Sequence, residues 1–401
     1  MPWPWLEKID HAFANWQLKR ARNINDLRAA ARIRMPSPMF HYMDGGAEDE
    51  VNLKRSCSSF DDYELLPRNL NDISHIDPST TILGQAVDIP VFCSPTGMSR
   101  LFHHDGELAV SRAAARANTI YTLSTMGTYS IEDVAKVCDG PKWFQIYVFK
   151  DRTLVSEFIE RCKAAEYHAM CLTIDLSLTG NRERDLRTGM TIPPKFSLAG
   201  WFDFALHPLW SLSYLSTPPF SLANVEHRVS TGDDGDVTTL VDYISGQFDR
   251  TVTWDDAAFM AEEWGGPFVV KGVLTVHDAL RAVDIGAKAI MVSTHGGRQL
   301  DHTPAPIDVL AEIVAAVGDR AEVICDGGIR RGTDVLKALA LGARAVSLGR
   351  GYLFGLGAGG EAGVDRALAL LKEEIVRDMA LLGCRSIEEI TSEHVRRRLR
   401  V

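Results

Sequence analysis

The feature of this chain that most restricts its fold is an alternation of short apolar runs with helix-like segments, which begins near residue 89. Runs that are apolar on both faces and separated by helices predict a parallel sheet. Eight such units in roughly 270 residues favour a closed (β/α)8 barrel over an open doubly wound sheet, which is the competing architecture. The runs lie at 89–95, 120–125, 143–148, 169–175, 268–273, 289–294, 322–328 and 345–350.

Helical periodicity occupies the segments between the runs, for example at 106–117, 151–166, 275–286 and 332–342. The last two segments end in Gly286 and Gly342, as is typical just beyond a helix C-terminus. Polar residues gather where the apolar runs end, and in a (β/α)8 barrel the functional side chains stand at that rim. The chain is therefore expected to carry all its chemistry at one end of a barrel.

Two regions interrupt the alternation. Residues 1–88 contain helix-like stretches at 24–34 and 38–50 and then irregular sequence, which predicts a helical cap over a barrel formed by residues 89–401. Residues 188–252 form an insertion after the fourth run, far longer than the ~2–6 residues usual for a loop between strand and helix. Long loops of this kind carry function or move.

Composition narrows the function classes. The 401 residues include 43 Lys and Arg against 53 Asp and Glu, and the net charge of −10 disfavours nucleic acid as a partner. The 7 cysteines are scattered and form no C-x-x-C pair, so neither a disulfide framework nor a zinc or other metal site is expected. Neither a signal peptide nor a membrane-spanning run is recognisable, and we expect a cytoplasmic protein.

The segment HGGRQLD at 295–301 places His295 and Arg298 at the end of the sixth run. A guanidinium binds a carboxylate through two parallel hydrogen bonds. An imidazole beside it can take a proton from the carbon next to that carboxylate, or from the hydroxyl on that carbon. A lone histidine in a polar loop is more often structural, but a base and a cation on one turn at a strand end favour a catalytic site. Asp175, at the end of the fourth run, is expected to orient the imidazole, and Arg182 to be a second carboxylate ligand or a surface ion-pair partner.

The segment from 326 to 350 has two glycine-rich turns, at Gly327 and Gly328 and at Gly349, with Arg330 and Arg350 beside them. Loops after the seventh and eighth strands of this fold commonly bind phosphate through backbone N–H groups. A phosphate-bearing cofactor is therefore expected.

Two further features need separate interpretations. Lys271 ends an apolar run, where a lysine needs an anion or an electron-rich ring as its partner. The glycines of GLGAGG at 355–360 match G-x-G-x-x-G but follow the eighth run and precede the last helix, so they do not predict a dinucleotide site.

Taken together, these motifs resemble the FMN-dependent L-2-hydroxy acid dehydrogenases and oxidases, and among them the membrane-associated L-lactate and mandelate dehydrogenases most. Glycolate oxidase and flavocytochrome b2 are more distant. The resemblance covers about residues 40–384 and rests on YMDGGAED, PTGM, LST, WFQIYV, LTID, GNRERD, VVKGVL, HGGRQLD, DGGIRRG and LGR.

The resemblance implies roles for individual residues. His295 would be the catalytic base, supported by Asp175, with Arg182 and Arg298 binding the substrate carboxylate and Tyr42 and Tyr147 hydrogen-bonding the substrate. The implied catalytic group is His295, Asp175, Tyr147 and Arg298. The residues implied to bind FMN are Pro95, Thr96, Gly97, Ser124, Gln145, Thr173, Lys271, Ser293, Asp326, Gly327, Gly328, Arg330, Gly349 and Arg350.

The chain also departs from the family pattern. Thr294 replaces the usual asparagine before the histidine, and Gly97 is similar to the dehydrogenase branch, where glycolate oxidases tend to have alanine. Met126 stands where some oxidases of small substrates place a bulky aromatic side chain, which indicates a different or roomier pocket. With Thr179 it is expected to share the pocket wall.

The insertion contains an aromatic-rich stretch at about 198–220 that is interrupted by Asp203 and His207. It cannot span a bilayer but could lie in its interface, as a similar insertion does in the membrane-associated dehydrogenases. A lid on the barrel and an oligomer contact are the alternatives. Location on the inner face of the membrane and assembly into a homo-oligomer, such as a tetramer, are further expectations.

We therefore expect FMN-dependent oxidation of an L-2-hydroxy monocarboxylate, such as lactate or mandelate, to the 2-oxo acid. A quinone or another electron-transfer acceptor other than oxygen would receive the electrons. The alternatives are an oxidase that uses O2 and releases H2O2, a flavin-binding module without turnover, and an aldolase or isomerase in which Lys271 forms a Schiff base.

Overall fold

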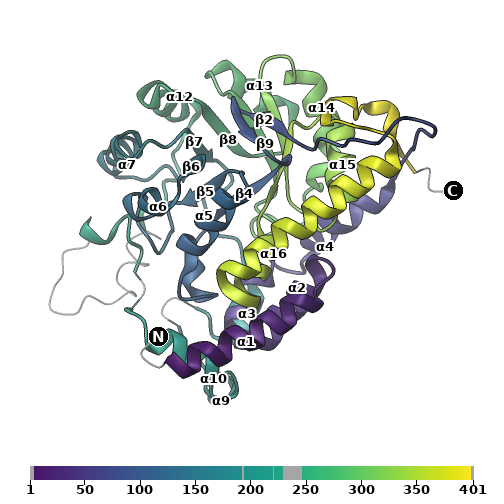
Figure 1. Ribbon diagram of the computed structural model, residues 1–401. Helices are drawn as coiled ribbons and strands as arrows, with labels where there is room; N and C mark the ends of the chain where they lie inside the picture. The colour runs from purple at the N-terminus through teal and green to yellow at the C-terminus, as the bar shows by residue number, and fades with distance from the viewer. Residues whose placement is uncertain (1–3, 192–193, 220, 229–245, 399–401) are drawn as a thin grey trace.

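The computed structural model describes residues 4–191, 194–219, 221–228 and 246–398, and its core is a closed barrel of eight parallel strands (Figure 1). In spatial order the strands run β10-β11-β4-β5-β6-β7-β8-β9, and β9 closes onto β10. The (β/α)8 prediction is confirmed, and the open doubly wound sheet is wrong. The strands are β4 (Val91–Thr96), β5 (Tyr121–Ser124), β6 (Lys142–Ile146), β7 (Ala169–Thr173), β8 (Phe268–Val273), β9 (Ala289–Ser293), β10 (Glu322–Asp326) and β11 (Ala345–Leu348).

A hairpin closes the N-terminal end of the barrel. It consists of β2 (Thr80–Ile82) and β3 (Gln85–Val87), and its turn residue Leu83 donates a backbone hydrogen bond to Glu322 at the start of β10. Ile82 and Val87 are buried in one apolar cluster with inward-facing strand residues such as Trp143 and Met291. Because this end is sealed by apolar packing, a ligand can enter only from the carboxyl ends of the strands.

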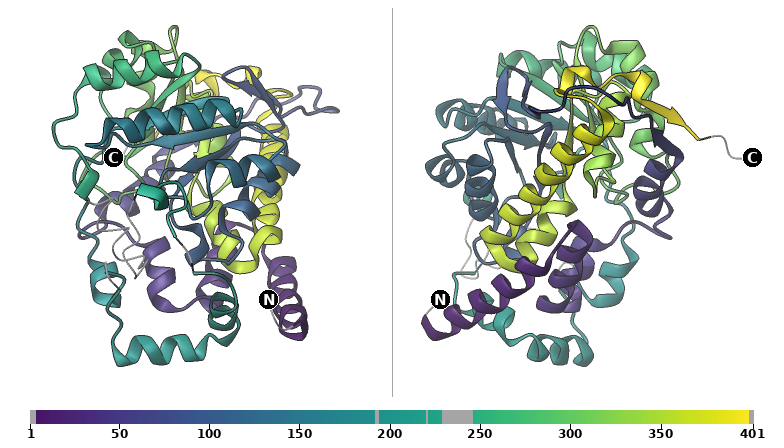
Figure 2. Two further views of the ribbon diagram at one scale, coloured as in Figure 1. Left: turned by 90° about the vertical axis from the view of Figure 1, so that its left-hand side faces the viewer. Right: turned by 45° about the vertical axis from the view of Figure 1, so that its right-hand side comes forward.

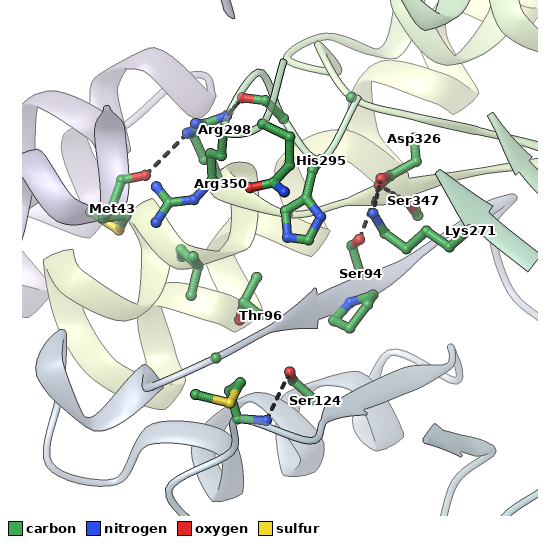
Figure 3. A pocket seen from close by; sticks show the side chains of 18 of the residues that line it. Met43, Ser94, Thr96, Ser124, Lys271, His295, Arg298, Asp326, Ser347 and Arg350 are labelled. Carbon is green, nitrogen blue, oxygen red and sulfur yellow. Dashed lines mark hydrogen bonds and ion pairs between the residues drawn. The ribbon is translucent and has the colours of Figure 1, made fainter. Parts of the chain in front are cut away.

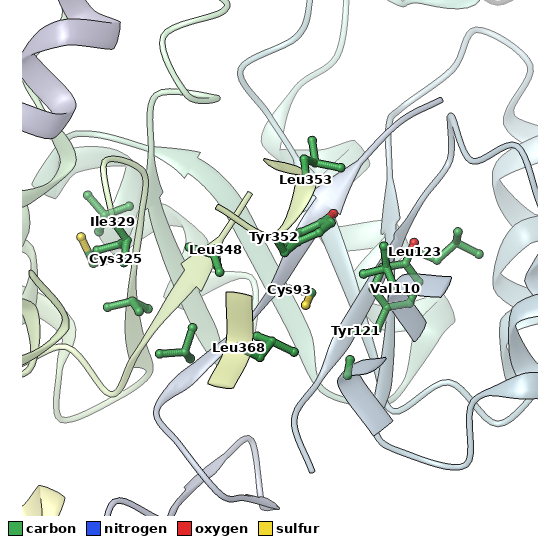
Figure 4. Packing of buried hydrophobic residues seen from close by; sticks show 14 of the residues in the cluster. Cys93, Val110, Tyr121, Leu123, Cys325, Ile329, Leu348, Tyr352, Leu353 and Leu368 are labelled. Carbon is green, nitrogen blue, oxygen red and sulfur yellow. The ribbon is translucent and has the colours of Figure 1, made fainter. Parts of the chain in front are cut away.

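Helices surround the barrel and pack on the outward faces of its strands. Figure 4 shows Tyr352 and Leu368 from the last helix beside Cys93 and Tyr121 from neighbouring strands. Gly286 and Gly342 follow two helix C-termini with φ of +94° and +98°, in agreement with the sequence. The helices after the eight strands are α5 (Gly106–Arg116), α6 (Ile131–Val137), α7 (Arg152–Ala164), α12 (Trp254–Trp264), α13 (Val276–Asp284), α14 (Pro306–Val317), α15 (Gly332–Ala340) and α16 (Arg350–Leu382).

The N-terminal region packs on the barrel rather than standing apart. Helix α2 (Ile24–Arg34) lies along α16 in Figure 1, and Asn23 caps its first turn by accepting a hydrogen bond from the N–H of Asp26. The expected helix at 38–50 is shorter, because α3 (Ser37–Asp44) ends before Gly45 and Gly46. The region also contains α1 (Pro4–Arg20), α4 (Val51–Ser58) and the 3-10 turn η1 (Ser59–Asp62).

Short pairings join the ends of the chain. The segment expected to be irregular before residue 88 contains β1 (Tyr63–Leu65), which pairs antiparallel with β12 (Val395–Arg397), in addition to the β2–β3 hairpin. Three-residue strands have too few residues to show an alternating pattern, so the sequence did not predict them. The remaining short turns are η2 (Ser99–Leu101), η4 (Ile387–Glu389) and η5 (Ser392–His394).

The insertion after β7 is largely helical where it is described. It holds α8 (Glu183–Thr188), which begins before residue 188, then α9 (Leu198–Leu206), α10 (Pro208–Leu215) and η3 (Glu226–Arg228). Figure 2 shows α9 and α10 projecting at the end of the molecule where α1 lies. Residues 229–245 of the expected insertion lie outside the described part of the chain.

The glycines of GLGAGG lie inside α16, so the expectation that they precede the last helix is wrong. They have packing roles: a Cβ on Gly355 would stand 2.2 Å from the carbonyl oxygen of Gly363, and one on Gly357 2.9 Å from the sulfur of Met35. The helix kinks at Gly359 and Gly360, whose backbone angles are not helical.

Candidate active site

A pocket opens at the carboxyl ends of the barrel strands and is also walled by the N-terminal region (Figure 3). It brings together sixteen of the residues that the sequence singled out for the site. Four others, Asp175, Gln145, Thr173 and Ser293, do not line it. The sixteen are Tyr42, Pro95, Thr96, Gly97, Ser124, Tyr147, Arg182, Lys271, His295, Arg298, Asp326, Gly327, Gly328, Arg330, Gly349 and Arg350.

His295 and Asp175 form the pair expected of a base and its orienting carboxylate. The Nδ1 atom of His295 lies 2.9 Å from Oδ1 of Asp175, and the imidazole borders the pocket. A proton on Nδ1 satisfies this contact and leaves Nε2 with a lone pair as a base. Burial acts to raise the pKa of Asp175, but the imidazole of His295 and the ammonium of Lys271 outweigh it and lower that pKa.

The backbone around the histidine is held in an unusual conformation. His295, Gly296 and Gly297 all have positive φ, at +55°, +66° and +71°. A Cβ on Gly297 would stand 2.7 Å from the backbone nitrogen of Leu53, so the turn requires glycine there. The hydroxyl of Thr294 is buried without a hydrogen-bond partner among the described residues.

Gly272 makes room for the orienting carboxylate. Its φ is +100°, and a Cβ there would lie 2.8 Å from the carboxyl carbon of Asp175. Gln299 fixes the same region, because its amide donates to the backbone carbonyls of Asp175 at 2.8 Å and Leu178 at 2.9 Å. Neither residue was assigned a role from the sequence, although both lie within the motifs VVKGVL and HGGRQLD.

Two guanidiniums share one aromatic ring in the pocket. The Cζ atom of Arg298 lies 5.0 Å and that of Arg182 5.4 Å from the ring centroid of Tyr42. Burial and the nearby Arg182 charge lower the pKa of Arg298. Arg182 also contacts Asp185 at 3.5 Å, but Asp185 is buried, so this is not the surface ion pair that was the alternative, and Arg182 lines the pocket. Two cations held together in this way favour binding of an anion such as a carboxylate.

Tyr147 contacts a residue that the sequence did not identify. The ring of Phe248 packs edge-on against it, with centroids 5.5 Å apart, and lines the pocket. Phe248 forms an isolated β-bridge with Phe149, so the C-terminal end of the insertion returns to the barrel mouth. Burial raises the pKa of the Tyr147 hydroxyl, which therefore stays protonated and can donate a hydrogen bond. Met126 and Thr179 line the same pocket, as expected.

Lys271 forms an ion pair with the carboxylate of Asp326. Its Nζ lies 3.0 Å from a carboxylate oxygen of Asp326 and donates to the hydroxyl of Ser293 at 2.9 Å. Asp326 also accepts hydrogen bonds from Ser94, at 3.0 Å, and Ser347. Burial acts to lower the pKa of Lys271, but Asp326 outweighs it and the pKa is raised. Lys271 is thus a charged lysine at the pocket floor, which does not favour its use as a Schiff-base nucleophile.

The cation Arg350 lies partly buried at the N-terminus of the last helix. Arg350 is the first residue of α16, and its guanidinium donates to the backbone carbonyls of Met43, Gly45 and Gly296 at 3.0, 2.7 and 2.8 Å. Burial, Arg298 and Arg330 lower the pKa of Arg350 to about 9. Such crowding of positive charge at a helix N-terminus favours a bound phosphate.

The donor set fits FMN. At the ring end, the side-chain nitrogen of Gln145 and the hydroxyl of Thr173 are buried without partners among the described residues, although Gln145 accepts a hydrogen bond from Ser124 at 2.8 Å. Unpaired polar atoms of this kind need a polar ligand. At the other end, a Cβ on Gly328 would lie 1.8 Å from the carbonyl of Ser56, so only glycine allows this turn beside Arg330.

Comparison with known proteins agrees with this geometry. A family model described as FMN-dependent dehydrogenase matches residues 31–397. An L-lactate oxidase of Nostoc is 42% identical over 372 residues, which are 92% of this chain and 96% of the relative. A glycolate oxidase of Spinacia oleracea is 40% identical over 93% of this chain and 95% of the relative. A solved structure of a monotopic membrane protein, (S)-mandelate dehydrogenase, superposes with a TM-score of 0.90 at 36% identity, covering 94% of this chain and 100% of that chain.

Proposed function

Since this chain belongs to the family of FMN-dependent dehydrogenases, we propose that it oxidises an L-2-hydroxy monocarboxylate, lactate-like or mandelate-like, and delivers the electrons to a quinone or another acceptor other than oxygen. The coarser activity, FMN-dependent oxidation of the CH–OH group of a 2-hydroxy acid, follows from the family. One observation carries the substrate part of the proposal: His295, held by Asp175, and the guanidiniums of Arg182 and Arg298 border a single pocket.

His295 is the proposed base. With its Nδ1 proton directed at Asp175, its Nε2 accepts a proton from the substrate, and the carboxylate of Asp175 stabilises the imidazolium that results. Bound FMN would supply the acceptor for the two electrons that leave the substrate carbon. The lowered pKa of Asp175 keeps this carboxylate ionised at neutral pH, as this role requires.

Arg298 and Arg182 are the proposed ligands of the substrate carboxylate. Arg298 keeps its orientation through hydrogen bonds to the backbone carbonyls of Tyr42 and Gly45, at 2.7 and 3.2 Å. Tyr42 and Tyr147 are proposed to bind the substrate through their hydroxyl groups. A carboxylate fixed in this way orients the substrate hydroxyl toward His295.

The residues proposed to hold FMN divide by position. Lys271 lies at the pocket floor and supplies a positive charge where the flavin ring can take negative charge. Arg330, Arg350 and the α16 N-terminus supply the phosphate site. The other proposed FMN residues are Pro95, Thr96, Gly97, Ser124, Gln145, Thr173, Ser293, Asp326, Gly327, Gly328 and Gly349.

The proposal of a quinone acceptor rests on the surface of the insertion. Leu198, Trp201, Phe202 and Leu206 of α9 have 89%, 61%, 67% and 62% of their surface exposed. Exposed side chains of this kind favour contact with a membrane interface through about residues 198–220, on the inner face in our proposal. Every helix in the described residues is too short or too polar to cross a bilayer. A lipid-soluble acceptor would then be within reach of the site.

Two structural points complete the proposal. Residues 1–88 act as a cap on the barrel of residues 89–401, because Met43 and Gly45 of the cap hold Arg350 in place. The protein assembles as a homo-oligomer, for which a tetramer is our expectation.

The second candidate is an oxidase that passes electrons to O2 and releases H2O2. It is favoured by the 42% identity to an L-lactate oxidase. Both candidates use the same substrate half-reaction, so only the acceptor separates them.

Anaerobic titration tests the substrate half-reaction. L-lactate, (S)-mandelate, glycolate and longer 2-hydroxy acids are added to the flavin-loaded protein under nitrogen, and loss of the visible flavin absorbance is followed. Bleaching by an L-2-hydroxy acid but not by its D enantiomer supports the proposal, whereas no bleaching by any of them refutes it. The bleached protein is then mixed with air or with a soluble quinone. Rapid recovery of colour in air with release of H2O2 would establish the oxidase instead.

A further inference from the structure

Helix α1 carries an apolar stripe that the rest of the described structure leaves exposed. Ile9, Phe13 and Trp16 are 52%, 36% and 55% exposed, and their spacing of four and three residues puts them on one helix face. The rings of Phe13 and Trp16 stack with centroids 6.4 Å apart. Helix α1 also precedes the segment that the family model matches, which starts at residue 31.

The charges around this stripe have one sign. Lys8, Lys19 and Arg20 are exposed, and the guanidinium carbon of Arg20 lies 4.6 Å from the Trp16 ring centroid. The single acid between residues 8 and 20 is Asp10, which is buried in an ion pair with Arg34 of α2. A locally basic face is notable in a chain of net charge −10. We call Ile9, Phe13 and Trp16 with these three cations the α1 outer face.

The opposite side of α1 is firmly packed. Ala14 and Leu18 are buried, and they meet α16 at its kink, where a Cβ on Gly359 would stand 2.8 Å from a methyl group of Leu18. Arg366 of α16 donates to the carbonyl of Ala21 at 3.0 Å. The α1 outer face is therefore held in a fixed orientation by the rest of the fold.

Helix α1 lies at the same end of the molecule as α9. Figures 1 and 2 place α1, α9 and α10 together, opposite the end that bears α12 and α14. A small cavity is lined both by Arg34, the ion-pair partner of α1, and by Trp210 and Ser213 of α10. Ser213 also hydrogen-bonds to His104 at 3.0 Å, beside the same cavity.

We propose that the α1 outer face is a second membrane-contact element, which binds an anionic lipid surface beside α9. The proposal extends the membrane contact proposed above for the insertion and adds its lipid preference. Aromatic and aliphatic side chains would enter the interface while Lys8, Lys19 and Arg20 face lipid phosphates. Since α9 and α10 contribute few charges, the α1 outer face would supply most of the dependence on anionic lipid.

A second copy of the chain fits this face less well. An antiparallel pairing of two α1 helices would bring Lys8 of one chain near Lys19 and Arg20 of the other. A parallel pairing would set each cation against its own copy. In both cases like charges meet, and residues 8–20 offer no exposed acid to compensate them, which disfavours association. An anionic bilayer provides the opposite charge.

Vesicle flotation of the flavin-loaded full chain tests the proposal. One vesicle set contains phosphatidylcholine alone and the other includes about 30% phosphatidylglycerol, an anionic lipid. The double variant Phe13→Ser/Trp16→Ser removes the aromatic part of the face, and Lys19→Gln/Arg20→Gln removes charge. The matched control is Phe259→Ser, which changes an aromatic residue of similar exposure, 54%, on α12 at the opposite end. Flavin content and dye-coupled activity check that each variant is intact.

The expected results are specific. The wild type and Phe259→Ser float with the anionic vesicles, and Phe13→Ser/Trp16→Ser binds them at least about tenfold more weakly, because the variant loses both aromatic side chains that would enter the interface. Lys19→Gln/Arg20→Gln loses the preference for anionic vesicles. Wild-type binding by both α1 variants would overturn the proposal. So would unchanged flotation with a smaller oligomer by light scattering, because the face would then be a subunit contact.

A parallel variant separates this inference from the membrane role of the insertion. Trp201→Ser/Phe202→Ser weakens binding to both vesicle sets, whereas the α1 charge variant affects only the anionic set. If the α9 variant alone abolishes flotation and the α1 variants bind as the wild type does, the inference about α1 fails while the proposed function stands. Quinone reduction in detergent reports on that function independently.

Discussion

Replacement of Asp175 by asparagine tests how the carboxylate supports the base. The side chain keeps its size and an oxygen that can still accept the Nδ1 proton of His295, whose nitrogen lies 2.9 Å away in the wild type. What the variant loses is the negative charge opposite the imidazolium. Two unit charges about 4 Å apart at an effective dielectric constant of about 20 interact by about 4 kcal/mol. Partial solvent access reduces this, because the carboxylate side chain is 17% exposed.

We therefore expect Asp175→Asn to raise the barrier by about 2–4 kcal/mol, which is a loss of about 30- to 1,000-fold in rate. The assay is stopped-flow bleaching of the flavin by saturating substrate under nitrogen. Saturation removes effects on substrate affinity, and the flavin content of the purified protein shows whether the cofactor site survives.

The matched control is Asp301→Asn. Asp301 is buried and lies in the loop that carries His295, but its oxygens accept hydrogen bonds from the backbone N–H groups of Val51 and Asn52 at 3.1 and 2.7 Å and not from the imidazole. Its variant should bleach at close to the wild-type rate. An Asp175→Asn rate within about threefold of wild type, which is under 1 kcal/mol, would refute the assigned role. An equal loss in Asp301→Asn would attribute the effect to the loop instead.

Three further outcomes are expected. His295→Gln should retain FMN but lose nearly all flavin reduction by substrate; substantial reduction would remove the histidine from the role of base. Phe248→Ala, which removes the ring against Tyr147, should change the ratio of kcat/KM for (S)-mandelate to that for L-lactate by about tenfold, and an unchanged ratio would mean that Phe248 does not contact the substrate side chain. Burial acts to raise the pKa of Asp326, but Lys271, Ser293 and Ser347 outweigh it, so the pKa lies below the ordinary value of 3.8. The ionised carboxylate therefore stabilises the fold above that value, and the stabilisation is lost as the pH falls. Between pH 5 and pH 3, chemical denaturation should show a larger loss of unfolding free energy for the wild type than for Asp326→Asn, and parallel losses would contradict the pKa shift.

The sequence predicted the barrel because each strand is apolar on both faces and ends in residues with a distinct chemical role. Lys271 after FVV and His295 after MVST mark strand ends without any tertiary information. Once the barrel closes, strand ends distant along the chain meet at one rim, which is why residues from 95 to 350 could be assigned to one pocket. Tyr42 lies in α3 and was assigned only from the family resemblance.

Features that depend on contacts between distant parts of the chain could not be predicted from the sequence. Phe248 lies in the insertion, and nothing in its neighbourhood shows that this segment returns to Tyr147. The kink at Gly359 arises where α1 meets α16, and a glycine-rich stretch alone does not distinguish a kink from a loop. The only hint in the sequence that position 272 requires glycine is its place next to Lys271. The requirement itself comes from the close approach of Asp175, which leaves no room for a Cβ.

The carbonyl oxygens that hold Arg298 and Arg350 come from Tyr42, Met43 and Gly45, which are synthesised hundreds of residues earlier. During translation this stretch leaves the ribosome long before Arg298 and Arg350 are synthesised. Its carbonyl oxygens therefore have neither guanidinium to bind until the later part of the chain emerges. An incomplete chain therefore lacks the contacts that orient these two guanidiniums, which form only when the N-terminal segment packs against the last third of the polypeptide.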